Sequence, residues 1–499
     1  MKNKYIFIIV IIFICISICN CGKVQLNKET INIEENNFEE AIEENSLNIN
    51  IDGEPLDINP ITSTDKLSKF IILNTHEGLF YKKDNKIQNG LVEKYEISEN
   101  QLEYTFYLKN ARWSDGKEIT SEDIKNSWIN VLKSESAAYN SYKLYNIRNA
   151  EKYAKGILND EAKIGIDIID DKIIKVTLEH ENNNFIDDLT LFVFYPYRND
   201  NIFSGPYVID SWTHNEKIVL KSNLEYRNYN KNSIEHINIS MMTGNIKPVN
   251  EFAKGNLDIS TISLKEKYRY KDQEALKIIL NDSVYALVFN FNNKTINNIH
   301  FRNSIQNYFP YEIFRNEIVK SDTPEIKGFN SLDNNEEKYK TKQQEKSNAR
   351  KNIELKMIYN NEFVPNKLAA IIQQIVYNLG YDVNIKMMSE SLYYDALSNS
   401  KFDMAIIKLK SSYINNWGYL ESFYSKSPNN YYNLVDSDID KAYEINTQES
   451  AIRAEVLIKA NAYAIPLSYG ANYFLVNSEL EDVEFLNDGI LYLGNIKHN

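Results

Sequence analysis

An alternation of strand and helix patterns between residues 353 and 407 constrains the fold of this chain most strongly. The segment opens with the apolar strand pattern IELKMIY, continues with the helical pattern NKLAAIIQQIVYNLG, which ends at Gly380, and then gives YDVNIKMM, SLYYDALS and FDMAII. Apolar periodicity distinguishes strands from helices, and glycine is typical of a helix end. The pattern therefore predicts an α/β domain with a largely parallel sheet.

A polar segment, KLKSSYINNW at 408–417, follows the last of these strands without a turn residue. Ligands of open α/β sheets bind beyond the carboxyl ends of the strands. Lys408 to Tyr413 are therefore candidates for a ligand site. A solvated loop at the end of a strand is the alternative of equal weight.

The length of the chain requires more than this one domain. A chain of 499 residues exceeds the roughly 250–300 residues at which a single core stops growing, so two or three domains are expected. LEYTFYLK alternates like a half-buried strand, and a helix follows that Thr120 caps with Asp123 three residues on. Further strands are expected at 172–179, 207–212, 217–222, 236–242 and 284–292.

The first 21 residues have the pattern of a secretion signal. Lys2 and Lys4 precede an apolar run from Tyr5 to Ile18, which is short for a membrane-spanning helix. All cysteines of the chain lie in this segment, at positions 15, 19 and 21. A disulfide framework or a cysteine metal site is therefore not expected in the folded body.

The residues around Cys21 resemble a lipoprotein signal, although Asn20 stands where a small residue is usual. The resemblance implies that Cys21 carries a lipid and becomes the mature N-terminus. Residues 22–47 are rich in Glu and Asn, so we expect an acidic spacer that cannot bury enough surface to fold. Without processing at Cys21 the segment remains as an uncleaved anchor. Either way the protein is expected to be exported and tethered to a cell-envelope membrane, facing the periplasm or the cell surface.

Charge and motifs exclude several classes of function. A formal net charge of −13 argues against nucleic acid or anionic lipid headgroups as the main partner. The six histidines form no HExxH motif, and neither a GxSxG elbow nor a GxxxxGK[ST] phosphate loop is present. We therefore expect no catalytic site, no metal site and no cofactor.

Segments along most of the chain resemble the extracellular solute-binding proteins of peptide-type ABC transporters, family 5, whose members include oligopeptide- and dipeptide-binding proteins. The most specific likeness is RWSDGKEITSEDIKNSWINVL, which resembles the family's Trp-Ser-Asp-Gly turn and capped Ser-Trp helix. GEPLDINPITSTDK, HEGLFYKKDNKIQNGLVEKYEI, SGPYVIDSWTHNEKIVLKS, FAKGNLDIS and VYALVFNFNNKTINNIHFRNSI are similar to other family segments and occur in the family's order.

The resemblance implies an α/β fold of the periplasmic-binding-protein-like type II kind, with two lobes, an extra small domain and two hinge crossings. Closure of such lobes around a ligand is a recognised mode of switching. Mapped onto this chain, the expected parts are a signal peptide at 1–21, a spacer at 22–47, a discontinuous lobe 1 at 48–79, 202–285 and 465–499, an extra domain at 80–201 and lobe 2 at 286–464.

The resemblance also places the polar segment after residue 407 in the ligand cleft. Relatives typically have Gly-Trp, two variable residues and Asp-Tyr there, and the aspartate pairs with the α-ammonium of a peptide. Here Lys408-Leu409 and Ser412-Tyr413 stand at those positions, so the tyrosine is kept and the carboxylate is lost. A buried ammonium without a counter-ion is costly, and the two lysines favour an anionic or carboxylate-bearing ligand. The predicted ligand-binding residues are Thr62, Asn126, Lys408, Lys410, Ser412, Tyr413 and Trp417.

Two functions remain open at this point. The first is a lipid-anchored, monomeric substrate-binding component of an ABC importer, which binds an oligopeptide or peptide-like solute between two closing lobes and delivers it to permease subunits. The second is a paralogue that has lost transport and serves as a surface interaction or adhesion lipoprotein. Stabilisation by a ligand would distinguish the first from the second.

Overall fold

The computed structural model describes residues 45–499 except 64, 84–85, 134–140, 183, 231–233, 245, 271–272, 315–325, 330–341, 343–349, 361–365, 411–416, 428, 446 and 487–488. The chain divides into two units, 1–44 and 45–499, and only the second is described here. The predicted signal peptide with Cys21, nearly all of the predicted spacer, Ser412 and Tyr413 lie outside the described residues. Within the described part, no helix has both the length and the apolar character needed to cross a membrane.

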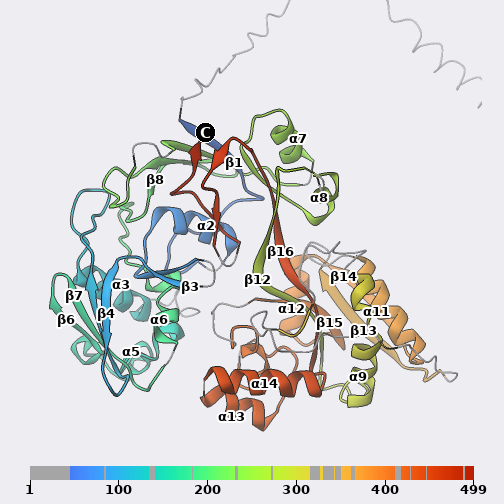
Figure 1. The fold of residues 1–499 in the computed structure, drawn as a ribbon. Coiled ribbons are helices and arrows are strands. Elements are labelled where there is room, and N and C mark those ends of the chain that lie inside the picture. Colours follow the sequence, from blue (N-terminus) through green and yellow to red (C-terminus); the bar gives the residue numbers. More distant parts are fainter. Residues whose placement is uncertain are drawn as a thin grey trace, which may run out of the picture. The chain divides into compact units, whose positions relative to one another are not determined.

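One sheet of ten strands runs through residues 45–499 (Figure 1). Its strands are β1 (Ser46–Asn50), β8 (Tyr207–Thr213), β9 (Lys217–Ser222), β10 (His236–Ser240), β11 (Ile259–Ile262), β12 (Leu276–Phe289), β13 (Glu354–Asn360), β14 (Asp382–Met388), β15 (Met404–Lys410) and β16 (Ala464–Val476). Their order across the sheet is β14-β13-β15-β12-β16-β11-β1-β10-β9-β8.

The alternating strand and helix segments form the β14-β13-β15 end of this sheet. β13 pairs in parallel with both β14 and β15. Helices α11 (Asn366–Asn378) and α12 (Glu390–Ser398) connect these strands, and α11 buries one face that includes Leu368, Ile372 and Val376. The predicted α/β arrangement with parallel pairing is confirmed for this segment. The sheet then continues in the antiparallel sense, because β12 pairs antiparallel with β15.

Strands β12 and β16 carry the sheet from one hydrophobic core to another. They run side by side (Figure 1) and pair antiparallel. Their register shifts between Leu280 and Val284. Ile279 packs against one core, whereas Val284 and the residues after it belong to the next. The chain therefore crosses between these two cores twice, once along each strand.

Gly470 permits the close pairing at the register shift. A Cβ atom on Gly470 would lie 2.0 Å from Oγ of Ser283 and 2.5 Å from Oδ1 of Asn281. Any larger residue would force these two side chains of β12 to move. The irregular part of the crossing strands is thus built around a glycine.

The buried apolar residues of the described chain form three clusters. The lobe 1 core contains residues of β1, β8 to β11, the end of β16 and the C-terminal segment up to Ile496. The extra-domain core runs from Ile61 to Phe194, and the lobe 2 core runs from Val284 to Tyr469. The residue boundaries that we gave to the two lobes and the extra domain stay a prediction.

A four-stranded sheet and a capped helix form the extra domain. The sheet order is β4-β5-β7-β6, with β4 (Val92–Ile97), β5 (Glu103–Leu108), β6 (Ile166–Asp170) and β7 (Ile173–Thr177). Helix α3 (Ser121–Lys133) follows the predicted cap, because the backbone N–H and hydroxyl of Thr120 donate to Asp123 at 2.8 Å and 3.0 Å. Trp113 and Trp128 are buried in the core of this domain.

Several short elements complete the described part of the chain. The strands are β2 (Phe80–Lys83), β3 (Lys86–Asn89), β17 (Leu480–Glu481), β18 (Glu484–Phe485), β19 (Leu491–Tyr492) and β20 (Lys497–His498). The helices are α2 (Lys66–Thr75), α5 (Ala150–Ala154), α6 (Phe185–Asp188), α7 (Lys247–Ala253), α8 (Leu264–Tyr270), α9 (Ile299–Tyr308), α10 (Tyr311–Ile313), α13 (Ser437–Ile445) and α14 (Gln448–Ala460), with 3-10 turns η1 (Tyr142–Leu144), η2 (Glu161–Lys163), η3 (Phe192–Phe194) and η5 (Glu421–Phe423).

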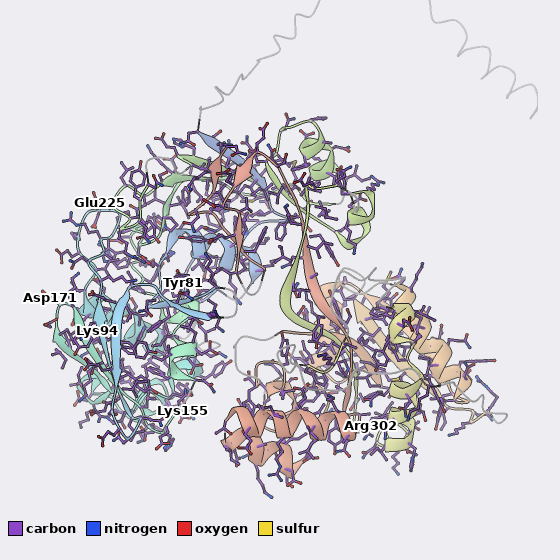
Figure 2. The ribbon with its side chains drawn as sticks, viewed as in Figure 1. Tyr81, Lys94, Lys155, Asp171, Glu225 and Arg302 are labelled. Carbon is purple, nitrogen blue, oxygen red and sulfur yellow. The ribbon has the colours of Figure 1, made fainter. Side chains whose placement is uncertain are left out.

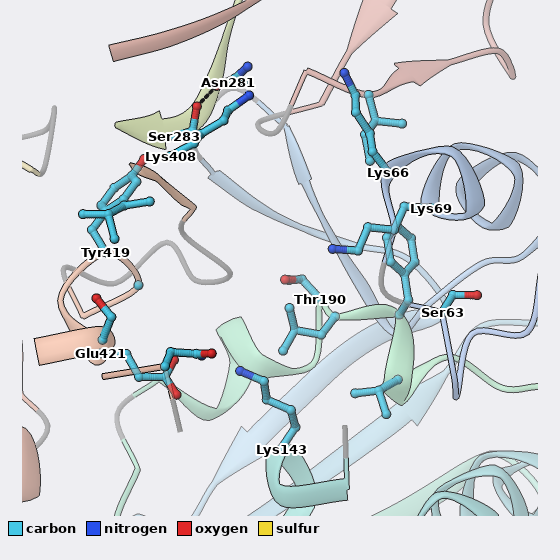
Figure 3. Close-up of a pocket in the computed structure, with 18 of the residues that line it drawn as sticks. Ser63, Lys66, Lys69, Lys143, Thr190, Asn281, Ser283, Lys408, Tyr419 and Glu421 are labelled. Carbon is cyan, nitrogen blue, oxygen red and sulfur yellow. Dashed lines mark hydrogen bonds between the residues drawn. The ribbon is translucent and has the colours of Figure 1, made fainter. Parts of the chain in front are cut away.

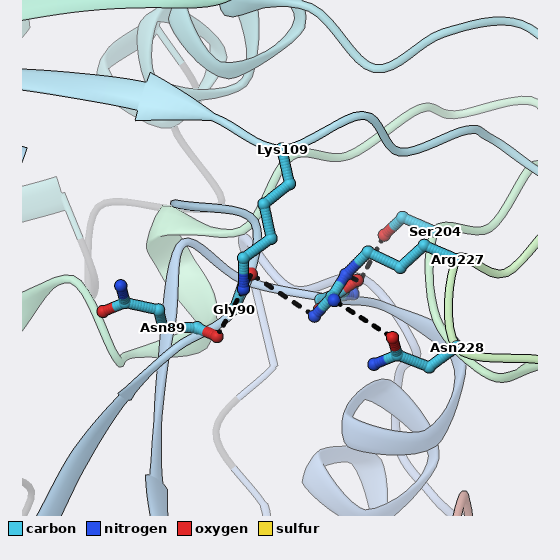
Figure 4. A network of polar contacts seen from close by, with 7 residues as sticks. Asn89, Gly90, Lys109, Ser204, Arg227 and Asn228 are labelled. Carbon is cyan, nitrogen blue, oxygen red and sulfur yellow. Dashed lines mark hydrogen bonds and ion pairs between the residues drawn. The ribbon is translucent and has the colours of Figure 1, made fainter. Parts of the chain in front are cut away.

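A polar network anchors the chain where lobe 1 passes into the extra domain (Figure 4). Nε of Arg227 donates to both carboxylate oxygens of Glu77 at 3.1 Å. Nζ of Lys109 and Nη2 of Arg227 donate to the carbonyl of Gly90, at 2.8 Å and 3.3 Å. A Cβ atom on Gly90 would lie 2.2 Å from the carbonyl oxygen of Gly78. The HEGL and NGL segments therefore meet here by direct backbone contact.

Arg302, labelled in Figure 2, holds α9 against the start of β16. Its side chain is buried and donates to the carbonyls of Ile296 at 2.8 Å, Asn461 at 2.9 Å and Ala462 at 3.1 Å. The hydrogen bonds to three carbonyls offset the cost of burying the guanidinium. The arginine of the HFRNSI segment thus has a structural role in lobe 2.

Candidate functional site

A cavity of about 510 Å³ lies beside the crossing strands. Its walls come from α2 and the loop before it, from parts of the chain between Tyr81 and Tyr195, from β12 and β16, and from lobe 2 between Tyr393 and Tyr432 (Figure 3). Ligand sites of proteins are typically clefts of roughly 300–1,000 Å³. The cavity thus has the size of a binding site. Residues from the parts of the chain that form each of the three cores contribute to its lining.

Amide and hydroxyl groups of the crossing strands line one side of the cavity. Ser283 donates to Oδ1 of Asn281, and Nδ2 of Asn281 donates to Oδ1 of Asn472 at 3.0 Å. Nδ2 of Asn472 in turn donates to the carbonyl of Gly489 at 3.3 Å. All three side chains line the cavity, so the irregular part of β12 and β16 places polar groups in its wall.

Tyrosines supply much of the remaining wall. Tyr393 and Tyr432 are almost fully buried, and the hydroxyl of Tyr393 donates to the carbonyl of Ile406 at 2.7 Å. Tyrosine combines a large apolar face with a polar tip, which suits it to contacts with varied ligands. The described tyrosines of the lining are Tyr81, Tyr142, Tyr195, Tyr393, Tyr394, Tyr419, Tyr431 and Tyr432.

The charged residues of the lining are mostly lysines. Among the described residues, the lining contains five lysines, at 66, 69, 82, 143 and 408, and one carboxylate, Glu421. Lys66 and Lys69 stand in the first turn of α2, and Lys143 stands on η1. Lys82 forms an ion pair with Asp187 at 2.9 Å. The charge of the cavity wall is thus opposite in sign to that of the whole chain.

Burial shifts the pKa of a lysine in this wall and of a carboxyl group near it. It lowers the pKa of Lys143 to about 8, and the neighbouring charge of Lys69 acts in the same direction. Glu421 and Asp188 act against this shift. Burial likewise raises the pKa of Asp188 to about 7. Lys143 therefore carries its charge at neutral pH and loses it only a little above.

The structure brings only part of the predicted site to the cavity. Lys408 lines the cavity, with its Nζ 5.7 Å from the ring centroid of Tyr285. The backbone of Lys410 pairs with Ser283 in the sheet, while its side chain lies outside the described part. Ser412 and Tyr413 lie outside the described residues.

The other three predicted residues lie outside the lining as described. Thr62 donates to the carboxylate of Asp57 in its own loop. Asn126 is exposed on α3. Trp417 is 3 % exposed in the lobe 2 core and packs edge-on against Tyr443, with ring centroids 5.1 Å apart. Gly418 and Tyr419, directly after the tryptophan, do line the cavity.

Several cavity residues were not predicted from the sequence. Lys66 and Lys69 follow the helix cap Asp65, which accepts from the N–H of Ser68 at 2.9 Å. Recognising this cap in TDKLSK would have placed both lysines on one helical turn. Lys143 and Glu421 carry no comparable local signal, because their proximity to the cavity depends on tertiary packing.

No metal site is found near this cavity or elsewhere in the described chain. Among the described residues, no group of three His, Cys, Asp or Glu side chains could hold a metal ion. The polar amides, tyrosines and lysines around this cavity make it the candidate binding site for a solute.

Comparison with known proteins identifies the family. Residues 86–431 match the bacterial extracellular solute-binding proteins, family 5. The oligopeptide-binding protein OppA of Bacillus subtilis is 24% identical over 510 aligned residues, which cover 90% of this chain and 92% of the relative.

Solved structures show the same fold. A periplasmic oligopeptide-binding protein from Borrelia burgdorferi superimposes with a TM-score of 0.76 at 21% identity, covering 91% of this chain and 100% of that one. The Haemophilus influenzae OppA complex with the peptide RPPGFSPFR gives a TM-score of 0.73 at 18% identity, covering 91% and 99%. The predicted periplasmic-binding-protein-like α/β fold is confirmed.

The fold and the cavity thus define a solute-binding protein. The chain belongs to the bacterial extracellular solute-binding proteins of family 5. The family consists of binding proteins, so the prediction that this protein is not an enzyme is confirmed. Its extracellular character likewise agrees with the predicted export of the chain.

Proposed function

We propose that this protein is the substrate-binding component of an ABC importer and binds an oligopeptide or peptide-like solute in the cavity beside β12 and β16. The cavity itself carries the proposal. Its lining includes residues from the lobe 1 end and from the lobe 2 end of the two crossing strands. Closure about such a pair of strands would enclose a ligand. ABC permease subunits would receive the ligand from the closed form.

Glu421 is our candidate for the group that binds the α-ammonium of a peptide. The aspartate that relatives place before the tyrosine is Ser412 in this chain. Glu421 is the one carboxylate that the described lining offers (Figure 3). A charge-assisted hydrogen bond to an ammonium is about twice as strong as a neutral one, so Glu421 would offset the desolvation of the peptide N-terminus.

The lipid anchor belongs to the proposal as well. The residues around Cys21 resemble a lipoprotein signal, and a lipid on Cys21 would keep the binding protein near its permease. Mass spectrometry of the N-terminal peptide tests this part. A diacylglyceryl mass on Cys21 supports the anchor, and an unmodified N-terminus that precedes Cys21 contradicts it.

Thermal unfolding in the presence of peptides tests the proposed function. A ligand that binds only the folded state at a hundred times its dissociation constant stabilises it by about 2.7 kcal/mol. We expect the melting temperature to rise with the concentration of a short peptide with a free N-terminus, and to rise less when that N-terminus is acetylated. Glu421→Gln should remove the difference between the two peptides.

The outcome also decides between the two functions that the sequence left open. If no peptide in a broad panel shifts the melting temperature, transport of peptides is refuted. A surface interaction or adhesion function would then explain better why a member of this family has an altered cleft.

A further inference from the structure

The cavity wall and the rest of the chain differ in the sign of their charge. The chain has a formal net charge of −13, yet the described lining contains five lysines and one carboxylate. A cavity with walls of one sign concentrates ligands of the opposite sign. The charge of the cavity wall therefore indicates the charge of the ligand, whereas the net charge of the whole chain does not.

Two groups of lysines face the cavity from different elements. Lys66 and Lys69 are three positions apart on α2, so they lie on one side of that helix. Lys143 on η1 lies near enough for the charge of Lys69 to lower its pKa. Figure 3 shows Lys66 and Lys69 on the right of the cavity, Lys143 at its lower edge and Lys408 at the upper left, beside Asn281 and Ser283.

Lys69 and Lys143 oppose each other, because the charge of Lys69 lowers the pKa of Lys143. Like charges at short range raise the free energy of the protein, and partial burial adds a desolvation cost. A negatively charged ligand between the two groups offsets both terms. Carboxylates act on these lysines as well, since Glu421 and Asp188 raise the pKa of Lys143 against the effect of burial and Asp187 pairs with Lys82.

We propose that the cavity selects acidic peptides, whose Asp or Glu side chains or C-terminal carboxylate lie between the lysines of α2 and η1 on one side and Lys408 on the other. This inference rests on the proposed function of peptide binding. A small anion alone would leave much of the 510 Å³ and its tyrosine walls unfilled, so a peptide fits the site better than a free carboxylate.

Isothermal titration of the full-length protein in detergent tests the inference with three matched peptides, Ala-Glu-Glu-Ala, Ala-Gln-Gln-Ala and Ala-Lys-Lys-Ala, and with citrate as a small anion. The glutamate peptide should bind about tenfold more tightly than the glutamine peptide, the size expected for one or two partly screened ion pairs. The lysine peptide should bind most weakly. Added salt should narrow the difference between the glutamate and glutamine peptides.

Single substitutions locate the effect. Lys69→Gln and Lys408→Gln should each reduce the preference for glutamate over glutamine by about threefold, and Lys143→Gln should remove it. Lys155→Gln is the matched control, because Lys155 is exposed, pairs with Glu151 and lies outside the described lining (Figure 2). Its preference should equal that of the unmodified protein. Retained binding of the glutamine peptide shows that each variant is folded.

The outcomes separate the charge preference from the proposed function. Equal affinity for the glutamate and glutamine peptides overturns the charge preference and leaves peptide binding intact. Failure of all three peptides to bind overturns peptide binding itself. Citrate binding as tightly as the glutamate peptide overturns the assignment of a peptide, because the anionic group alone would then account for the affinity.

Discussion

The binding of an acidic peptide should weaken as the pH rises from 7 to 9, because Lys143 loses its proton in the empty cavity. Burial holds the pKa of Lys143 at about 8, below its ordinary value of 10.5. A carboxylate placed beside the ammonium offsets the desolvation and returns the pKa toward that ordinary value. Ligand and proton thus bind cooperatively at this residue.

The size of the effect follows from the two pKa values. With a pKa of about 8, Lys143 is about 90% charged at pH 7 and about 10% charged at pH 9 in the free protein. If the bound form stays charged, the apparent dissociation constant rises by the ratio of these fractions, about tenfold. Binding at pH 9 should take up about 0.9 proton.

Other charged groups around Lys143 affect the same titration. Glu421, Asp188 and Lys69 all interact with it electrostatically. The pKa of Asp188 is about 7, so this carboxyl ionises in the lower part of the range and also disfavours an acidic ligand as the pH rises. Lys143→Arg separates the two contributions, because arginine stays charged throughout and leaves only the part due to Asp188.

Isothermal titration at pH 7, 8 and 9 measures the dissociation constant of the acidic peptide. Pairs of buffers that differ in ionisation enthalpy give the number of protons taken up on binding. The account predicts a tenfold loss of affinity with proton uptake in the unmodified protein and a smaller loss in Lys143→Arg. An affinity for the acidic peptide that stays constant from pH 7 to 9 would refute the reasoning. An equal loss in Lys143→Arg would refute the role of Lys143.

Three further predictions concern the scaffold. Between pH 7 and pH 5 the unmodified protein should lose about 2 kcal/mol more unfolding free energy than His76→Asn, because burial lowers the pKa of His76 from 6.5 to about 3 and the unfolded chain binds the proton first. Glu77→Gln should cost about 3 kcal/mol, since it leaves the charge of Arg227 without its counter-ion. Gly470→Ala should cost about 2 kcal/mol and weaken peptide binding, because its Cβ atom meets Ser283.

Urea denaturation measures all three stability changes, and titration measures the binding defect. An equal acid sensitivity of the unmodified protein and His76→Asn contradicts the role of the buried imidazole. A loss below about 0.5 kcal/mol for Glu77→Gln, the scatter typical of surface changes, contradicts the buried ion pair. Unchanged peptide affinity in Gly470→Ala contradicts the importance of the register shift for the cavity.

Local sequence patterns were enough to predict the α/β segment and the helix cap. The parallel pairing of β13 with β14 and β15 follows from strand–helix alternation, and the Thr120–Asp123 cap follows from a four-residue pattern. The strand predicted at 284–292 ends close to the observed end of β12 at Phe289. β12 begins eight residues before the predicted start, at Leu276. Its first part, LKIIL, is apolar but partly exposed, and the polar residues 281–283 separate it in the sequence from the buried run that begins at Val284.

The cavity could be predicted only in part, because its residues meet through tertiary packing. Lys408 was predicted because it follows an apolar strand pattern, and it lines the cavity. It lies inside β15, which extends beyond the predicted strand to Lys410. Thr62 was expected in the cleft, but its hydroxyl donates to Asp57 within the same loop. Lys143 and Glu421 come from different cores, and no local pattern relates positions so far apart in the sequence.

Native mass spectrometry of the protein, purified without denaturant, tests the central claim most directly. The bound material is released by unfolding and identified by its mass and fragmentation. The account predicts a series of short peptides enriched in aspartate and glutamate relative to lysine and arginine. A single non-peptide compound, or an empty protein that no peptide stabilises, would contradict it.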